Sequence, residues 1–159
     1  SGTSNMKFMM NGAVTLGTLD GANVEISNFV GEDNAVIFGM REEEVKAIKF
    51  NGTYNPFDIY NSDPQIKAVM DSLLDGTFSS DHEQFRMIFD EIMYRNDEFM
   101  VLKDLESYLQ GCKKIETDYL NRDKWGRECL VNIACSGWFS SDRTIAEYNR
   151  DIWHLKKIH

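Results

Sequence analysis

Basic residues are too few in this sequence to support a nucleic-acid partner. The 159 residues include 17 lysines and arginines against 26 aspartates and glutamates, which gives a net charge of −9. Nucleic-acid binding depends on a basic surface that neutralises phosphates. The longest basic cluster is Lys156-Lys157, so we expect no nucleic-acid partner.

Cysteine is also scarce. The sequence contains three cysteines, an odd number, and they are widely spaced at Cys112, Cys129 and Cys135. No C-x-x-C pair occurs. This pattern argues against a disulfide framework and against a zinc site, and it is typical of a reducing, cytoplasmic environment. The three histidines show no ligand spacing, so we expect no metal site.

Long apolar runs are missing as well. No run approaches the roughly 20 residues that cross a bilayer, and no signal peptide is visible, so we expect no membrane partner. The length is consistent with a single domain. The first residue is a serine, within what reads as a functional loop. We therefore expect residues 1–159 to be one fragment of a longer protein.

Two kinds of sequence meet near residue 40. Residues 1–40 are rich in glycine, asparagine and short apolar runs. Residues 13–18 and 35–39 read as buried strands, and residues 22–30 as a helix that follows an Asp20-Gly21 turn. Strand, helix, strand is typical of a parallel α/β unit.

Residues 41–159 predict mainly helices. Asp63 caps a helix whose first residue is Pro64, with Gly76 as its end. Tyr54-Asn55-Pro56 is expected to be a turn. Apolar residues at helical spacing mark further helices over residues 85–93, 105–120, 125–134 and 141–153. The expected fold is therefore a helix-rich α/β fold.

The segment from Ser1 to Gly12 is a small polar loop running into a helix. Thr3, Ser4 and Asn5 are all candidate N-cap residues. A helix start offers backbone N–H groups and partial positive charge, which together can cradle a phosphate. Lys7, about one turn further on, could form a Schiff base with a cofactor whose phosphate rests on the loop. Taken alone, the pattern favours a capped helix with a surface lysine.

A second candidate segment, Gly17 to Glu25, lies between a predicted strand and a predicted helix. Ligand-binding residues of α/β proteins often lie at such positions. The spacing is not that of a dinucleotide or P-loop motif, and by itself it favours a tight turn. Asp20 is then a candidate helix cap and Glu25 a solvated helix residue.

Together these segments resemble a known family. The sequence S-G-T-S-N-M-K-F at residues 1–8, followed by G-T-L-D-G-A-N-V-E at residues 17–25, is similar to the cofactor segment of the glycogen phosphorylase family. Phe38-Gly39-Met40 and F-S-S-D-R-T-I at residues 139–145 also resemble that family, in the same order. Ser4 stands where many relatives have glycine.

The resemblance implies a fold and a reaction. The fold is GT-B, with two Rossmann-like halves, and this chain would be the last part of the carboxy-terminal half. The reaction is reversible phosphorolysis of a terminal α-1,4-linked glucose of glycogen, starch or maltodextrin, which yields glucose 1-phosphate. The enzyme would be a hexosyltransferase dependent on pyridoxal 5'-phosphate, with glucan and inorganic phosphate as its partners.

The resemblance also implies roles for particular residues. Lys7 matches the lysine that carries pyridoxal phosphate as a Schiff base. Thr3 and the backbone of Ser4 match groups around the cofactor phosphate. Ser1 and Gly2 match backbone donors to the glucose hydroxyls. In this family the cofactor phosphate acts as proton donor and acceptor beside the substrate phosphate.

Other groups of the family's site are expected upstream of Ser1. They include the glutamate that binds the sugar and the basic residues that bind the phosphates. We therefore expect the isolated chain to be inactive and free of cofactor, and the enzyme to be a homo-oligomer. An alternative is a non-catalytic glucan-binding or assembly module derived from a phosphorylase. A nucleotide-binding domain is a weaker alternative, because no glycine-rich dinucleotide motif is present.

Overall fold

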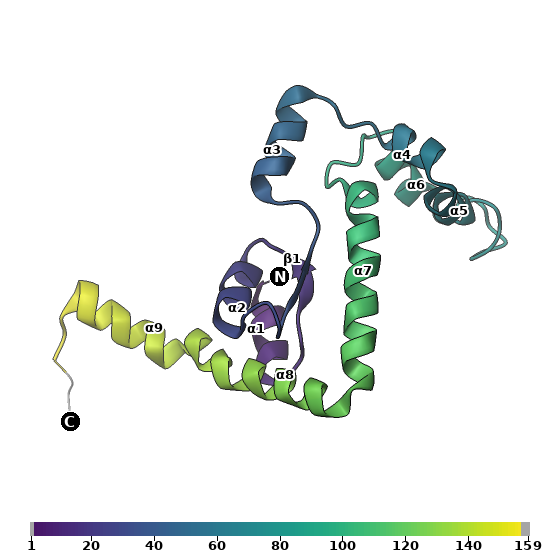
Figure 1. The fold of residues 1–159 in the computed structure, drawn as a ribbon. Helices are drawn as coiled ribbons and strands as arrows, with labels where there is room; N and C mark the ends of the chain where they lie inside the picture. Colours follow the sequence, from purple (N-terminus) through teal and green to yellow (C-terminus); the bar gives the residue numbers. More distant parts are fainter. Residues whose placement is uncertain (1, 157–159) are drawn as a thin grey trace. The chain divides into compact units, whose positions relative to one another are not determined.

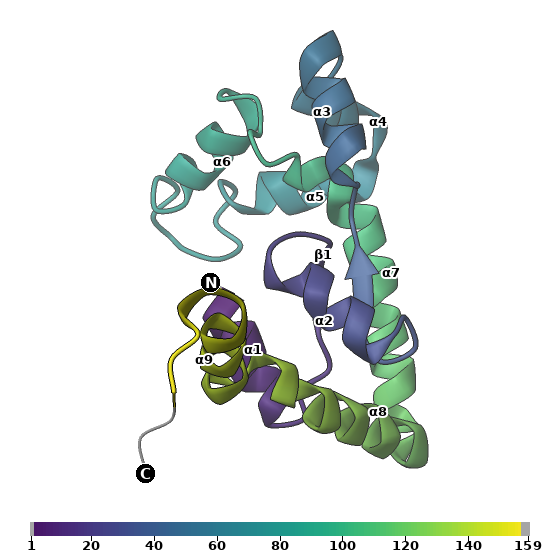
Figure 2. The ribbon, with the colours of Figure 1, turned by 90° about the vertical axis from the view of Figure 1, so that its left-hand side faces the viewer.

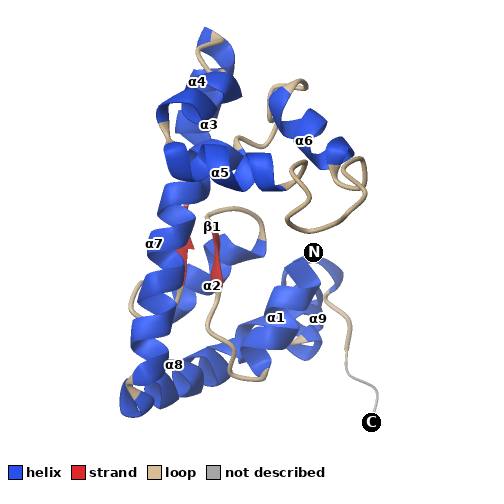
Figure 3. Cartoon of the chain, turned by 90° about the vertical axis from the view of Figure 1, so that its right-hand side faces the viewer, coloured by secondary structure: helices blue, strands red, loops and turns tan. Residues whose placement is uncertain are grey.

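A computed structural model describes residues 2–156 of the chain, with side chains from residue 3 onward. The described chain is mostly helical, with strand confined to β1 and β2 (Figure 3). The elements are, in order, α1 Gly2–Met10, β1 Leu16–Thr18, α2 Ala22–Val30, β2 Val36–Phe38, α3 Glu42–Asn51, α4 Pro56–Ser62, α5 Pro64–Ser72, α6 Arg86–Met93, α7 Val101–Leu120, α8 Arg122–Cys135 and α9 Ser141–Tyr148. A 3₁₀ turn, Ser136–Phe139, precedes α9, and a π-helical turn, Asn149–Trp153, follows it.

The predicted helix-rich α/β character is confirmed. The strands β1 and β2 pair in parallel, and α2 connects them. Both are shorter than expected, and residues 13–15 before β1 are not strand. The loop from β1 into α2 is seen in Figure 2. The bounds of α2 agree with the prediction, because Gly21 and Gly31 on either side both have positive φ angles.

The chain forms two compact units. Unit 1 combines the chain up to Ile37 with the chain from Gly111 on, and unit 2 covers Phe38–Gln110. The boundaries fall within β2 and within α7. The sequence pattern separates a strand-helix-strand part, residues 1–40, from a mainly helical part, residues 41–159. The assignment of both parts to one fragment of a single domain stays a prediction.

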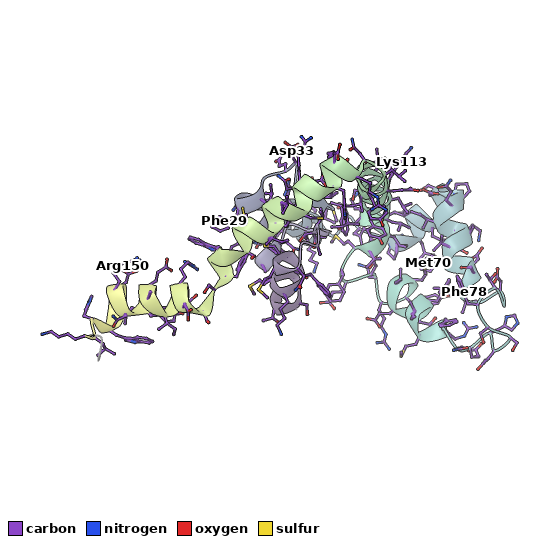
Figure 4. The ribbon with its side chains drawn as sticks, turned by 90° about the horizontal axis from the view of Figure 1, so that it is seen from below. Phe29, Asp33, Met70, Phe78, Lys113 and Arg150 are labelled. Atoms are coloured by element: carbon purple, nitrogen blue, oxygen red, sulfur yellow. The ribbon has the colours of Figure 1, made fainter. Side chains whose placement is uncertain are left out.

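The core of unit 1 lies between α1, α2 and α8. Met9 of α1 and Ile26 of α2 are fully buried, and Val30 and Ala35 complete the cluster. Val131 of α8 packs against it. In Figure 1 α8 passes below α1 and α2, and both helices contact it. Next to this core the ring of Phe29, labelled in Figure 4, lies 4.3 Å from that of Trp138, between centroids.

Unit 2 has a separate core. Its buried members come from α5, α6 and the start of α7, and they are Ile66, Met70, Phe89, Met93 and Leu102. Met70 lies among these helices, while Phe78 lies on the loop that follows α5 (Figure 4). The predicted start of α5 is confirmed, since the Asp63 side chain accepts hydrogen bonds from the backbone N–H groups of Gln65 and Ile66.

The prediction of a simple turn at Tyr54-Asn55-Pro56 is wrong. Pro56 is the first residue of α4, and the Asn55 side chain caps that helix by accepting a hydrogen bond from Phe57 N at 3.1 Å. A proline suits the first position of a helix because no hydrogen bond is required from its nitrogen there. The same two signals that mark α5 therefore also mark α4.

Candidate functional site

Helix α1 carries the residues to which the resemblance assigns a cofactor. Neighbouring residues of an α-helix are about 100° apart around its axis, so Thr3 and Lys7 lie on one face. Both are exposed, and so is Ser4. Gly2 is the first residue of the helix, whereas Ser1 lies outside the described residues. The structure thus brings Thr3, Ser4 and Lys7 together near the start of one helix.

The expectation that Thr3, Ser4 or Asn5 caps this helix is wrong. The helix already begins at Gly2, so all three residues lie within its first turns. The side chain of Asn5 is directed to a tertiary contact and does not cap α1. As a result Lys7 lies more than one full turn inside the helix.

The opposite face of α1 is anchored to α2. Asn5 and Met9 are four residues apart and therefore share a face, which is turned by about 200° from the face of Lys7. Met9 is fully buried and packs in the cluster that contains Ile26 of α2. Asn5 is half-buried, and its Nδ2 donates a hydrogen bond to Oδ1 of Asn23 at 2.6 Å.

Asn23 links α1 to the end of strand β1. Only 8% of Asn23 is exposed. Its Oδ1 accepts the bond from Asn5, and its Nδ2 donates to the carbonyl oxygen of Thr18 at 2.9 Å. Three successive elements, α1, β1 and α2, therefore meet at one buried amide.

The segment Gly17 to Glu25 forms the tight turn that its spacing predicts. The expectation that Asp20 caps α2 is wrong, because the N-cap residue is Gly21, with no side-chain hydrogen bond to the helix start. Gly21 has a φ of 48°, a conformation that glycine adopts at little cost. Glu25 is exposed, as predicted.

Charge around the start of α1 favours an anion. The helix contains Lys7 and no acidic residue. The aligned peptide dipoles place partial positive charge at a helix start, and the N–H groups of a first turn have no acceptor within the helix. A phosphate group at this end would therefore meet attraction from the helix and from the lysine.

Unit 2 contains a second polar feature, on the loop between α6 and α7. Asp97 is buried and accepts hydrogen bonds from the Tyr54 hydroxyl at 2.6 Å and from Leu102 N at 2.9 Å. Burial, followed by the hydrogen bond to Asp97, raises the pKa of Tyr54 well above its ordinary value. A pocket of about 360 Å³ adjoins this pair, and its lining includes Lys49, Tyr54, Arg95, Asn96 and Asp97.

Among residues 2–156, no group of three or more histidine, cysteine, aspartate or glutamate side chains is arranged to hold a metal ion. The same residues include no helix that is long and apolar enough to cross a membrane.

Sequence reasoning missed the contact between Asn5 and Asn23. Both residues belong to segments that the resemblance singles out, but their pairing spans 18 positions. A partial signal was present, because Asn23 stands three residues before Ile26 and so shares the apolar face of α2. A polar residue on a buried face requires a hydrogen-bond partner.

The comparisons with known proteins agree with the resemblance. Residues 1–155 match the family model described as carbohydrate phosphorylase. A glycogen phosphorylase of Bacillus subtilis (strain 168) is 49% identical over 158 residues, which cover 99% of this chain and 20% of that protein. The brain form of glycogen phosphorylase from Mus musculus is 47% identical, over 98% of this chain and 18% of that protein.

A glycogen phosphorylase of Haemophilus influenzae is 43% identical over 99% of this chain and 19% of that protein. The chain thus spans about a fifth of the length of these relatives. Since the family model covers nearly every residue, and the similarity to several relatives extends along the whole chain, the chain belongs to the carbohydrate phosphorylase family.

Proposed function

We propose that this chain is the cofactor-binding segment of an α-glucan phosphorylase. The whole enzyme would cleave the terminal α-1,4-linked glucose of a glucan with inorganic phosphate and release glucose 1-phosphate. The relatives named above are glycogen phosphorylases, which supports a storage glucan as the substrate. A GT-B fold, a cytoplasmic location and a homo-oligomeric state belong to the same proposal.

One observation carries the proposal. Thr3 and Lys7 share the exposed face of α1, while Asn5 and Met9 anchor the opposite face to α2. A helix that is anchored on one face and exposed on the other can present an amine and a phosphate-binding helix start to one ligand. Pyridoxal phosphate has both an aldehyde and a phosphate, so the donor set suits it.

Each residue has a role in this proposal. The Lys7 amine would hold the cofactor covalently through its aldehyde group. Thr3 and the backbone of Ser4 bind and orient the phosphate, while Gly2 and Ser1 are proposed to contact the glucose through their backbones. When bound, the cofactor supplies a phosphate that can exchange a proton with the substrate phosphate. The first turn of α1, by attracting that anion, holds it in place.

Borohydride reduction of the full-length holoenzyme tests the proposal. Reduction fixes the cofactor to its lysine, and peptide mass spectrometry locates it. We expect the pyridoxyl group on Lys7. Lys7→Arg should abolish covalent cofactor and nearly all glucose 1-phosphate formation, because arginine keeps the charge but not a reactive amine. Lys113→Arg, at an exposed lysine of α7, is the control and should change neither.

A pyridoxyl group on another lysine would refute the assignment of Lys7. Covalent cofactor on Lys7 without phosphorolysis, combined with glucan binding, would instead favour the non-catalytic module. The isolated 159-residue chain should release no glucose 1-phosphate. Catalysis requires several groups positioned together, and about four fifths of the length of the relatives lies outside this chain.

A further inference from the structure

We propose that Asn23, acting through Asn5, is a positioning residue that sets the direction in which α1 presents Lys7 to the cofactor. The inference deepens the proposed function and rests on it. Neither asparagine lies on the face that would touch the cofactor, so the proposed effect passes through the orientation of the helix.

Only one assignment of donors and acceptors allows both hydrogen bonds of Asn23 to form. The Thr18 carbonyl oxygen can only accept, so the amide of Asn23 must turn its Nδ2 toward it. This leaves Oδ1 of Asn23 facing α1, and Asn5 must then present its own Nδ2. The Thr18 carbonyl at the end of β1 therefore sets the orientation of both amides, and it ties α1 to them by a directional hydrogen bond.

Gly17 makes this arrangement possible. A Cβ atom at position 17 would lie 2.6 Å from Nδ2 of Asn23, which is closer than such atoms approach one another. The absence of a side chain on β1 therefore creates the space in which the Asn23 amide is held. A buried amide with this little freedom keeps a narrow range of orientations.

The rotation of α1 about its own axis depends on this bond. The other anchor on the same face, Met9, makes apolar contacts, and these are non-directional. A hydrogen bond loses strength when its angle is poor. A small roll of α1 would therefore weaken the Asn5 bond even where the apolar contacts of Met9 adjust to it. Since Lys7 lies about 200° around the helix from Asn5, the same roll would swing its long side chain sideways.

The experiment compares Asn23→Ala, Asn5→Ala and the double variant in the full-length holoenzyme. The readouts are the rate of cofactor release into a solution containing hydroxylamine, the absorption band of the bound cofactor, and the urea midpoint. We expect each single variant to release cofactor about tenfold faster and to shift the band, as loss of roughly one hydrogen bond to a buried group would. In cofactor release the double variant should match either single variant, because all three lack the hydrogen bond between Asn5 and Asn23.

Asn34→Ala is the matched control. Asn34 lies just beyond the other end of α2, and its Nδ2 donates to the Val30 carbonyl oxygen at 2.8 Å. It should lower the urea midpoint by less than Asn23→Ala, because one side-chain hydrogen bond is lost rather than two, and it should leave cofactor release and the absorption band unchanged. Asn5→Asp provides a variant of nearly equal volume. Its carboxylate cannot donate to Asn23, so it should release cofactor at least as fast as Asn5→Ala.

Cofactor release from Asn23→Ala within about twofold of wild type, together with a lowered urea midpoint, would overturn the inference and leave Asn23 a purely structural role. Failure of the proposed function is distinguishable, since the wild-type enzyme would then carry no reducible cofactor on Lys7. Amide hydrogen exchange of the cofactor-free protein would then decide. Exchange in α1 that is faster in Asn23→Ala but not in Asn34→Ala would support the positioning of α1 by Asn23, and unchanged exchange would overturn it.

Discussion

Two glycines of unit 1 should respond in opposite ways, in the stability of the fold, when each is replaced by alanine. At Gly17 an added Cβ would collide with the Asn23 amide, whereas at Gly126, in the exposed interior of α8, it would meet nothing within 4 Å. Glycine in a helix interior is unfavourable relative to alanine. The same substitution should therefore destabilise the first site and stabilise the second.

We predict that Gly17→Ala lowers the free energy of unfolding by about 1–3 kcal/mol, as overpacking of a tight interior does. Gly126→Ala should raise it by about 0.5–1 kcal/mol. Urea unfolding of both variants, followed by circular dichroism, measures the difference. Equal effects in the two variants would contradict the role assigned to Gly17.

Glu128 is a buried charge with poor compensation. Its side chain is 3% exposed, and its carboxylate oxygens accept no hydrogen bond from the described residues. The ammonium of Lys124 lies 3.6 Å from Oε1, but this lysine also pairs with Asp118. Removing a carboxylate from water costs free energy that such an arrangement does not recover.

We predict that Glu128→Met raises the free energy of unfolding by about 1 kcal/mol, because it removes a buried carboxylate that accepts no hydrogen bond from the described part of the chain, while the exposed Lys124 keeps Asp118 as its partner. Glu116→Met, at an exposed position of α7, is the control and should stay within about 0.5 kcal/mol of wild type. Chemical denaturation measures both. A clear loss of stability in Glu128→Met would show that the buried Glu128 carboxylate stabilises the fold.

At the scale of elements, a charge cluster joins α7 to α8. Asp118, near the end of α7, has a side chain that is 7% exposed. It accepts a hydrogen bond from Lys114 of its own helix at 2.6 Å and another from Lys124 of α8. These two lysines hold the pKa of Asp118 below its ordinary value. Since one lysine comes from each helix, the cluster should help to fix the corner between them.

This lowered pKa predicts an acid-dependent contribution to stability. A carboxylate whose pKa is lower in the folded state stabilises the fold above its unfolded pKa of about 3.9, and the contribution is lost as the pH falls through the folded value. We expect the free energy of unfolding to fall between about pH 5 and pH 2, with a smaller slope in Asp118→Asn. The exposed Asp33, replaced by Asn, is the control and should keep the wild-type slope. Identical slopes in all three proteins would rule out this contribution.

The boundaries of the helices show which structural features depend only on neighbouring residues. Asp63 with Pro64 and Asn121 before α8 mark helix starts that depend only on neighbouring residues. The apolar residues of α5 form only partly an interior face, since Ile66 and Met70 are buried but Val69 is 55% exposed. Helical spacing identifies a face, but the packing of other helices decides how wide the buried part of it is.

At the scale of the whole molecule, large apolar side chains remain exposed in both units. Phe50, Phe99 and Met87 of unit 2 are 92%, 82% and 77% exposed, and Leu120 of unit 1 is 75% exposed. Apolar surface of this extent tends to associate. In the relatives about four fifths of the length lies outside the matched part, so more chain is available there to cover the corresponding residues.

We predict that the 159-residue chain, produced alone, self-associates. Light scattering over a wide concentration range should give a mass that rises above the 18.4 kDa of a monomer. Replacing Phe50, Phe99 and Leu120 by glutamate should weaken the association, because added charge opposes apolar contact. A constant monomer mass for the unmodified chain would contradict this expectation.

The sequence by itself determined the family, through motifs at residues 1–8, 17–25 and 139–145, and most helices, through caps and apolar periodicity. These signals are local, because capping and periodicity involve residues within a few positions of each other. Only the tertiary structure decided which polar residues are buried together. Asn5 meets Asn23, and the Asn132 amide donates to the carbonyl oxygen of Asn34, 98 positions away. Such pairs form when packing withdraws both groups from water, and a short-range pattern does not encode that packing.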